Sequence, residues 1–304
     1  IELEEGYDKD YVAAVNIASA PTGQLIPPSN TLIVYATVAG SVSVAALFMA
    51  GYIPGIAWGI SLMFIAGYMA KRRGYVSTFS VTPKEALKVL WDALPSLLLI
   101  IIVIGGILKG VFTATEGSAI AVVYALILSL CYRSLKIKDL PSIILSSCKT
   151  TCIVIFMIGV SSIMSWVMAY TMIPTAIANA MLSLSSNKYV ILLLMNVILL
   201  VVGTFMDPTP AVLIFTPIFL PICQSFGMDP VQFGIMIVFN LCIGTITPPV
   251  GVILFTGCKV VGISIEGVIK TLLPFFAAIA VVLLLVTYVP AMSMWIPSML
   301  GLVK

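Results

Sequence analysis

Long stretches without a charged residue constrain the fold of this chain more than any other feature. Asp, Glu, Lys and Arg make up 9% of the 304 residues, and hydrophobic residues make up 61%. A soluble domain carries about 25% charged residues, and a helix needs roughly 20 apolar residues to cross a bilayer. We therefore predict an all-α integral membrane protein. The uncharged blocks are 11–70, 93–108, 117–132, 150–187, 189–206, 230–258 and 271–303.

The residue types that the chain lacks exclude several chemistries. There is no histidine, which excludes imidazole metal sites, Ser-His triads and histidine proton relays. The six cysteines form no CxxC pair, and we expect them to be small core side chains. We therefore expect no cofactor, no enzymatic activity and no nucleic-acid partner.

Two of the uncharged blocks contain a pair of adjacent prolines. They occur in "GQLIPPSN" and "GTITPPVG", as Pro27-Pro28 and Pro248-Pro249. Proline lacks a backbone donor and interrupts a helix. Irregular backbone at membrane depth is tolerated only where protein buries it or a polar cavity bathes it. Each pair therefore predicts a broken helix beside a polar site.

The proline pairs belong to an internal repeat. Residues 6–29 align without gaps to residues 227–250, at an offset of 221 positions. The identical residues are all glycine, aspartate or proline, the types that set backbone geometry. The repeat therefore predicts two copies of one broken helix. The identities pair Gly6 with Gly227, Asp8 with Asp229, Gly23 with Gly244, Pro27 with Pro248 and Pro28 with Pro249.

Basic residues predict the direction in which each copy crosses the membrane, because short cytoplasmic loops are rich in Lys and Arg. The sequence Lys71-Arg72-Arg73 predicts a cytoplasmic end for the span before it. Residues 189–225 could form two crossings or one re-entrant hairpin with its tip at "GTFMDPTP". Only the hairpin places Lys259 and Lys270 inside, and with the hairpin the two copies are inverted.

Inverted repeats with interrupted helices are the architecture of secondary transporters, whose sites lie near the bilayer midplane. Helix N-termini present N–H groups to an anion, and C-termini present carbonyls to a cation such as Na⁺. We therefore predict an ion and substrate site at the two breaks. Asp207 is a third candidate, because a carboxylate within the membrane is costly unless it is paired or ligated. It could instead cap the helix that begins near Pro208, and the two roles are compatible.

Other polar residues have simpler interpretations. Glu116 follows Thr113 in a helix-start pattern, so capping is favoured over a transport role. Asn16 and Asn240 are expected to form helix-to-helix hydrogen bonds rather than to act as ligands. An ion channel and an intramembrane enzyme remain rival classes. A channel would need an unbroken polar path, and an enzyme would need a nucleophile with a base, or a metal.

Five motifs in order carry a resemblance to a known family over essentially the whole chain. They are "GYDKDYVAA" with "GQLIPPSN", "LFMAGYIPG", "GVFTATEGSA", "GTFMDPTPAVLIFTPIFLPI" and "GMDPVQFGIMIVFNLCIGTITPPVGVILF". The chain resembles the large membrane subunit of tripartite ATP-independent periplasmic (TRAP) transporters. That family has further helices and a first hairpin before the "GYDK" element. The chain therefore resembles the C-terminal two thirds of such a subunit, or part of a fused small-plus-large polypeptide.

The resemblance implies a sodium-coupled importer of a carboxylate, such as a C4-dicarboxylate or a sialic acid, in the bacterial inner membrane. It implies a small four-helix membrane subunit and a periplasmic substrate-binding protein as partners, and an elevator-type motion. The nearest alternative is a related carboxylate carrier that works without a binding protein. The absence of histidine makes a proton relay less attractive than Na⁺, although Asp207 could carry a proton.

The resemblance also implies domains and site residues. Residues 1–45 and 189–265 would form the transport domain, and 46–188 would be mainly scaffold with an interfacial arm near 80–92. Residues 266–304 would form a C-terminal transmembrane helix. The implied sodium and substrate region comprises Gly23, Ser29, Asp207, Thr209, Gly244, Thr245 and Thr247.

Overall fold

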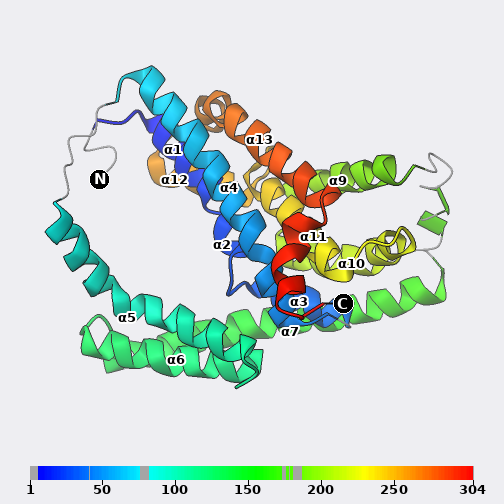
Figure 1. The fold of residues 1–304 in the computed structure, drawn as a ribbon, viewed down its shortest axis with the longest axis horizontal. Coiled ribbons are helices and arrows are strands. Elements are labelled where there is room, and N and C mark those ends of the chain that lie inside the picture. Colours follow the sequence, from blue (N-terminus) through cyan, green and yellow to red (C-terminus); the bar gives the residue numbers. More distant parts are fainter. Residues whose placement is uncertain are drawn as a thin grey trace. The chain divides into compact units, whose positions relative to one another are not determined.

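The computed structural model describes residues 6–40, 42–75, 82–172, 176–177, 179–180 and 187–303. Every regular element within these ranges is a helix (Figure 1). Seven of the described helices are long and apolar enough to cross a membrane, which agrees with the predicted all-α membrane protein. Their spans are Val44–Arg73, Lys84–Leu108, Ala114–Cys131, Ile137–Val160, Lys188–Phe205, Pro208–Ser225 and Ile265–Tyr288.

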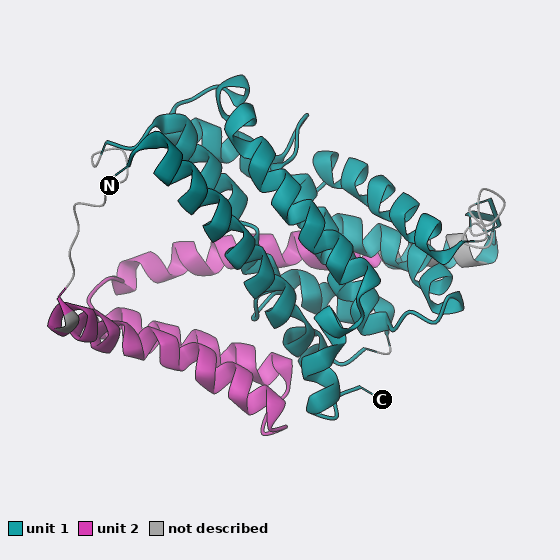
Figure 2. Ribbon diagram, turned by 45° about the horizontal axis from the view of Figure 1, so that its top comes forward, with its two compact units in different colours: residues 1–75, 161–304 teal, residues 76–160 magenta. Residues whose placement is uncertain are grey.

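The chain divides into two compact units, coloured separately in Figure 2. Unit 1 contains residues 1–75 and 161–304, and unit 2 contains residues 76–160. Unit 1 contains both proline pairs and the segment around Asp207. The predicted division into transport and scaffold domains stays a prediction.

The first proline pair interrupts a helix, as predicted. α1 (Lys9–Ser19) and α2 (Thr22–Leu25) precede it, and α3 (Asn30–Ala39) follows it. The residues between α2 and α3 are not helical, and the Pro27-Pro28 peptide bond is cis. α4 (Val44–Arg73) comes next.

The second proline pair interrupts a helix in the same way. α11 (Pro230–Ile246) precedes it and α12 (Val252–Val261) follows it, with a cis peptide bond between Pro248 and Pro249. α13 (Ile265–Tyr288) and α14 (Ala291–Met299) complete the chain. The buried residues of α11 run without interruption from Val231 to Ile246, so α11 is the central helix of unit 1.

The helices repeat with the same offset of 221 residues as the sequence. α4 begins at Val44 and α13 at Ile265, so the structural repeat continues beyond the aligned residues. Gly6 and Gly227 both have positive φ angles, of 88° and 73°. Each is followed two residues later by an aspartate at a helix N-cap. Glycine adopts such angles without steric cost, which explains its presence in both copies.

The two copies run in opposite directions within unit 1. The start of α1 contacts the start of α13, because Thr271 Oγ1 donates to Asp10 Oδ2 over 2.5 Å. The start of α11 contacts the end of α13, because Gln232 Nε2 donates to the Thr287 carbonyl over 3.1 Å. Thr271 and Thr287 are about 24 Å apart along the helix at 1.5 Å per residue. Figure 1 likewise shows the end of α4 beside the start of α13.

A helical hairpin precedes the second broken helix. It consists of α9 (Lys188–Phe205) and α10 (Pro208–Ser225), joined by Met206 and Asp207. Both helices pack against α11, and α10 also packs against α3. The sequence "GTFMDPTP" therefore forms the turn of this hairpin.

Unit 2 contains α5 (Pro83–Leu108), α6 (Ala114–Cys131), the 3₁₀ turn η1 (Ile137–Asp139) and the first part of α7 (Leu140–Tyr170). Thr113 and Glu116 form a capping box at the start of α6, so the capping interpretation of Glu116 is confirmed. α5 is continuous through Pro95. The part of the predicted interfacial arm from residue 83 to residue 92 lies within α5, and its place at the membrane interface stays a prediction.

Candidate functional site

The turn of the hairpin lies against the second break. Gly203 in α9 and Gly244 in α11 touch through their backbones, and a Cβ added to Gly244 would lie 2.5 Å from Gly203 Cα. The Gly251 N–H, just after the second proline pair, donates to the Thr204 carbonyl over 3.1 Å. Glycine is required where two backbones approach so closely. These contacts join the hairpin end to both sides of the break.

The first break reaches the same end of α11. Cys242 Sγ donates to Gln24 Oε1 over 3.1 Å, and α2 packs against both α11 and α4. Ile26, beside the first proline pair, packs against Gly55 of α4. The structure therefore brings the three segments that the sequence predicted as a site to the C-terminal end of α11.

The predicted hydroxyl residues are held in place by the backbone. Ser29 is buried, donates to the Gln24 carbonyl and caps α3 by accepting from the Leu32 N–H over 3.3 Å. Thr245 Oγ1 donates to the Cys242 carbonyl, and Thr247 Oγ1 donates to the Ile243 carbonyl, each over 2.7 Å. A hydroxyl that donates its proton keeps acceptor lone pairs, so these oxygens can still coordinate a cation.

Asp207 caps α10. Its Oδ1 accepts from the Thr209 N–H over 3.0 Å, and the side chain is exposed. This confirms the capping alternative. Within the described residues Oδ2 makes no hydrogen bond, so one carboxylate oxygen can still interact with a ligand. The Thr209 side chain is half-buried beside it.

The two glycines that the repeat pairs have different surroundings. Gly244 is in close contact with Gly203, whereas a Cβ added to Gly23 would meet nothing within 4 Å. Gly23 is exposed. The second proline of each pair, Pro28 at the first break and Pro249 at the second, is exposed. Gly23 therefore faces open space in this structure, and no contact explains its presence.

Several helix ends meet near the two breaks. The described residues contain no cluster of three His, Cys, Asp or Glu side chains that could hold a metal. Near the breaks, α2 and α11 end and α3, α10 and α12 begin. Such ends present backbone carbonyls to cations and N–H groups to anions. Ser29 caps α3 and Asp207 caps α10, whereas Gly251 at the start of α12 supplies no side-chain cap.

A buried amide network links α9, α11 and α13 and was only partly predicted. Asn240 Nδ2 donates to Asn196 Oδ1 over 2.8 Å, and Asn196 Nδ2 donates to Thr287 Oγ1 over 3.1 Å. The expectation that Asn240 bonds between helices is confirmed. The sequence analysis missed Asn196 and Gln232. They could have been found as single amides in otherwise apolar runs.

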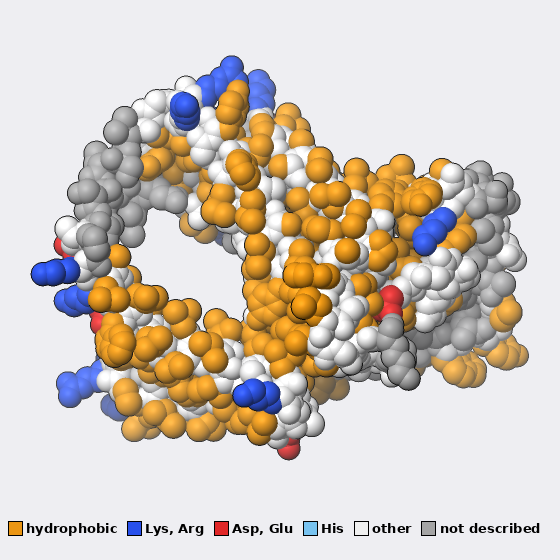
Figure 3. Space-filling model, viewed as in Figure 1, with side chains coloured by type: hydrophobic (Ala, Val, Ile, Leu, Met, Phe, Trp, Pro, Cys, Tyr) orange, Lys and Arg blue, Asp and Glu red, His pale blue; other side chains and the backbone are white. Residues whose placement is uncertain are grey.

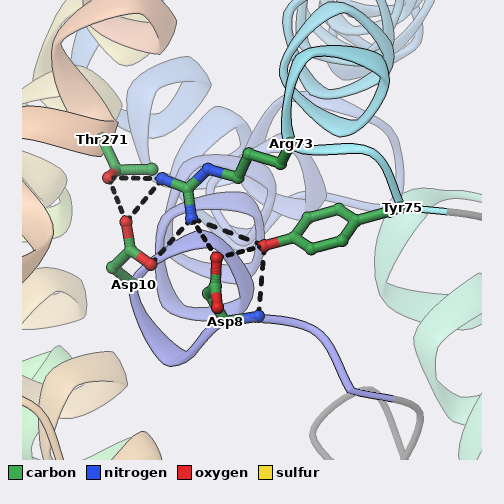
Figure 4. A network of polar contacts seen from close by, with 5 residues as sticks. All are labelled: Asp8, Asp10, Arg73, Tyr75 and Thr271. Atoms are coloured by element: carbon green, nitrogen blue, oxygen red, sulfur yellow. Dashed lines mark hydrogen bonds and ion pairs between the residues drawn. The ribbon is translucent and has the colours of Figure 1, made fainter.

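A charged cluster ties the start of α1 to the end of α4 and to the start of α13, and the sequence analysis missed it (Figure 4). Arg73 donates to both oxygens of Asp10, over 2.9 and 2.6 Å, and to Asp8 Oδ2 over 3.0 Å. Tyr75 and Thr271 complete the network. The sequence signal for this cluster was the acidic pair Asp8 and Asp10 and the basic run 71–73. They lie at opposite ends of the uncharged block 11–70.

Comparisons with known proteins agree with this architecture. A sequence model of the family described as "Tripartite ATP-independent periplasmic transporter, DctM component" matches residues 1–292. The chain belongs to this family. The family consists of transporter permeases rather than enzymes, and with seven candidate spans the chain is a multi-pass inner-membrane protein.

Three relatives show how much of a longer protein the chain matches. The uncharacterized protein YgiK of Salmonella typhimurium is 52% identical over 98% of this chain and 69% of its own length. The isethionate TRAP transporter permease protein DctMQ of Oleidesulfovibrio alaskensis is 40% identical, over 96% of this chain and 46% of its own length. The C4-dicarboxylate TRAP transporter large permease protein DctM of Pseudomonas aeruginosa is 37% identical, over 99% and 70%.

Proposed function

We propose that this chain forms the membrane pathway of a sodium-coupled importer of an organic acid. The observation that carries the proposal is the convergence of both helix breaks and the hairpin turn at the C-terminal end of α11. Gly203 contacts Gly244, and Cys242 contacts Gln24. Broken helices that meet between repeats are the usual location of ion and substrate sites in secondary transporters.

Sodium is the proposed coupling ion because the available ligands are neutral oxygens and one carboxylate. Ser29, Thr245 and Thr247 supply hydroxyl oxygens, helix C-termini supply carbonyls, and Asp207 supplies a charge. Histidine is absent from the chain, so a proton would depend on Asp207 alone. The site therefore suits Na⁺ better than a proton relay.

The proposed substrate is a carboxylate of the C4-dicarboxylate or sialic-acid type. The names of two relatives specify isethionate and C4-dicarboxylate, which are both small anions. The helix starts at Asn30 and Val252, and Thr209 at the hairpin turn, lie next to the segments that converge. Their N–H and hydroxyl groups would bind the acid group.

The proposed assembly has three components. A periplasmic binding protein would deliver the substrate, and a small four-helix membrane subunit would support the permease, either as a separate chain or fused as the name DctMQ suggests. Within the membrane the hairpin would be re-entrant and the copies inverted. Import would then follow an elevator-type movement of these elements against a scaffold.

Uptake by the complete transporter in proteoliposomes tests the proposal. Substrate should accumulate only with an inward Na⁺ gradient and with the binding protein present. Uptake that ignores sodium would overturn the coupling. Sodium-driven uptake of free substrate without the binding protein would favour the alternative carrier.

The variant Asp207→Asn separates the two roles of this residue. Asparagine caps a helix about as well as aspartate, so the melting temperature should stay within about 2 °C of wild type for this small change. Sodium-dependent uptake should be abolished because the charge is lost. Normal uptake by a folded Asp207→Asn permease would remove Asp207 from the site.

A further inference from the structure

A groove lies between the last turns of α4 and the start of α13, outside the candidate transport site. Its volume is about 480 Å³. On α4 the lining positions recur at intervals of three and four, so they form one stripe on the helix surface. On α13 the lining residue Pro274 lies one turn after Lys270. The groove is lined by Ile65, Tyr68, Met69, Arg72, Arg73 and Pro274.

The helix surfaces around this groove are apolar and exposed. Met63, Phe64 and Tyr68 on α4 are 66%, 75% and 65% exposed, and Leu273 on α13 is 58% exposed. α4 and α13 are both candidate membrane spans. In a bilayer such surfaces contact acyl chains, and a tyrosine near the end of a span lies at headgroup level. The groove therefore opens toward lipid.

Among the described residues, ion pairs neutralise only one of the basic side chains near the end of the groove. Arg73 is occupied by Asp8 and Asp10. Arg72 and Lys270 are exposed and form no ion pair within the part of the chain that the structure describes. The nearest acid along α13 is Glu266, one turn before Lys270. Figure 3 shows Lys and Arg side chains gathered at this end of α4, beside hydrophobic surface.

We propose that this groove binds one anionic phospholipid. Its acyl chain would lie along Ile65, Met69 and Pro274, and its phosphate would lie at the end marked by Arg72 and Lys270. An arginine fork matches phosphate geometry, and basic pockets between spans on the cytoplasmic side favour anionic headgroups. The positive-inside pattern of residues 71–73 predicts that this end is cytoplasmic. The proposal does not depend on what the transporter carries.

Native mass spectrometry and melting curves of the purified full-length permease test this site. The probes are phosphatidylglycerol and phosphatidylcholine with the same acyl chains, and inorganic phosphate. Phosphatidylglycerol should bind and raise the melting temperature more than phosphatidylcholine does. Arg72→Gln should weaken phosphatidylglycerol binding about fivefold, and Arg72→Gln with Lys270→Gln about thirtyfold, since each basic residue near a headgroup contributes about 1 kcal/mol.

Matched variants make the result specific. Lys138→Gln removes an exposed basic residue from unit 2 and should leave lipid binding unchanged. Arg72→Lys keeps the charge and should retain most of the binding. Unchanged binding in the Arg72→Gln, Lys270→Gln double variant would overturn the proposal. An equal loss in Lys138→Gln, or displacement of the lipid by inorganic phosphate, would overturn it as well.

Discussion

The second helix break is covered by a helical hairpin, whereas the first break packs against Gly51 and Gly55 of α4. At the second break, Gly203 packs against Gly244 and Leu241. In the first copy the equivalent of Leu241 is Ala20, which lines a groove of about 460 Å³ between α1 and α12. The same helical plan therefore exists in two different surroundings.

This difference shows which features belong to the broken helix itself. The cis proline pair, the glycine with positive φ and the aspartate at the N-cap occur in both copies. A backbone contact between two glycines occurs at the second break, whereas at the first break Gly51 and Gly55 of α4 pack against Leu25 and Ile26. The family resemblance implies a hairpin on the first copy as well, and that implication stays a prediction.

The largest effect is expected at Gly244, which the repeat pairs with Gly23. Gly244→Ala would force the hairpin turn away from the second break, because the added Cβ would meet the Gly203 backbone. Overpacking of this kind costs about 1–3 kcal/mol, and we expect sodium-dependent uptake to fall at least tenfold. Uptake by proteoliposomes and the melting temperature measure both effects.

Gly23→Ala is the matched control, since an added Cβ would meet nothing within 4 Å. Its stability should stay near wild type. If Gly23→Ala lowered the melting temperature as much as Gly244→Ala, packing against the hairpin would not explain the role of Gly244.

A smaller effect is expected at the charged cluster. Arg73→Gln removes the bidentate pair with Asp10 and leaves that carboxylate half-buried without its cation. We expect a loss of about 2 kcal/mol of stability, less than for a fully buried pair because both side chains retain some contact with solvent. Asp8→Asn should cost less, because the Asp8 side chain is 60% exposed. Reversible denaturation in mixed micelles would rank the two variants, and equal losses would contradict this interpretation.

The smallest effect is expected in the buried amide network. Asn196→Leu breaks the bonds from Asn196 to Thr287 and from Asn240 to Asn196. Hydrogen bonds between membrane helices contribute about 0.6 kcal/mol on average, so a loss of about 1 kcal/mol is expected in the same assay. A double variant with Asn240→Leu should cost less than the sum of the single variants. Additive costs would show that the two amides do not act together.

The sequence predicted the breaks better than their surroundings. Pro27-Pro28 and Pro248-Pro249 interrupt helices because proline has a local effect on the backbone. For Asp207 the sequence left two roles open, ion ligand and helix cap. The cap that the structure shows is a local contact as well. By contrast, Arg73 meets Asp10 only through folding, across 63 residues. Local patterns do not encode such pairings.

α5 shows that one proline does not by itself end a helix. The helix passes through Pro95 without interruption. Proline removes one hydrogen bond, and the residues on either side can remain helical. The two breaks carry more than this one signal, because each has a second proline and nearby glycines.

The most direct test of the central claim is ²²Na⁺ binding to the purified complete permease carrying Ser29→Ala or Thr245→Val. One substitution lies at each break, and each removes a hydroxyl whose hydrogen-bond partners are within its own broken helix. If the two breaks and the hairpin turn share one sodium and substrate region, each variant should bind Na⁺ at least several-fold more weakly while remaining folded. Unchanged Na⁺ affinity in both folded variants would contradict the account.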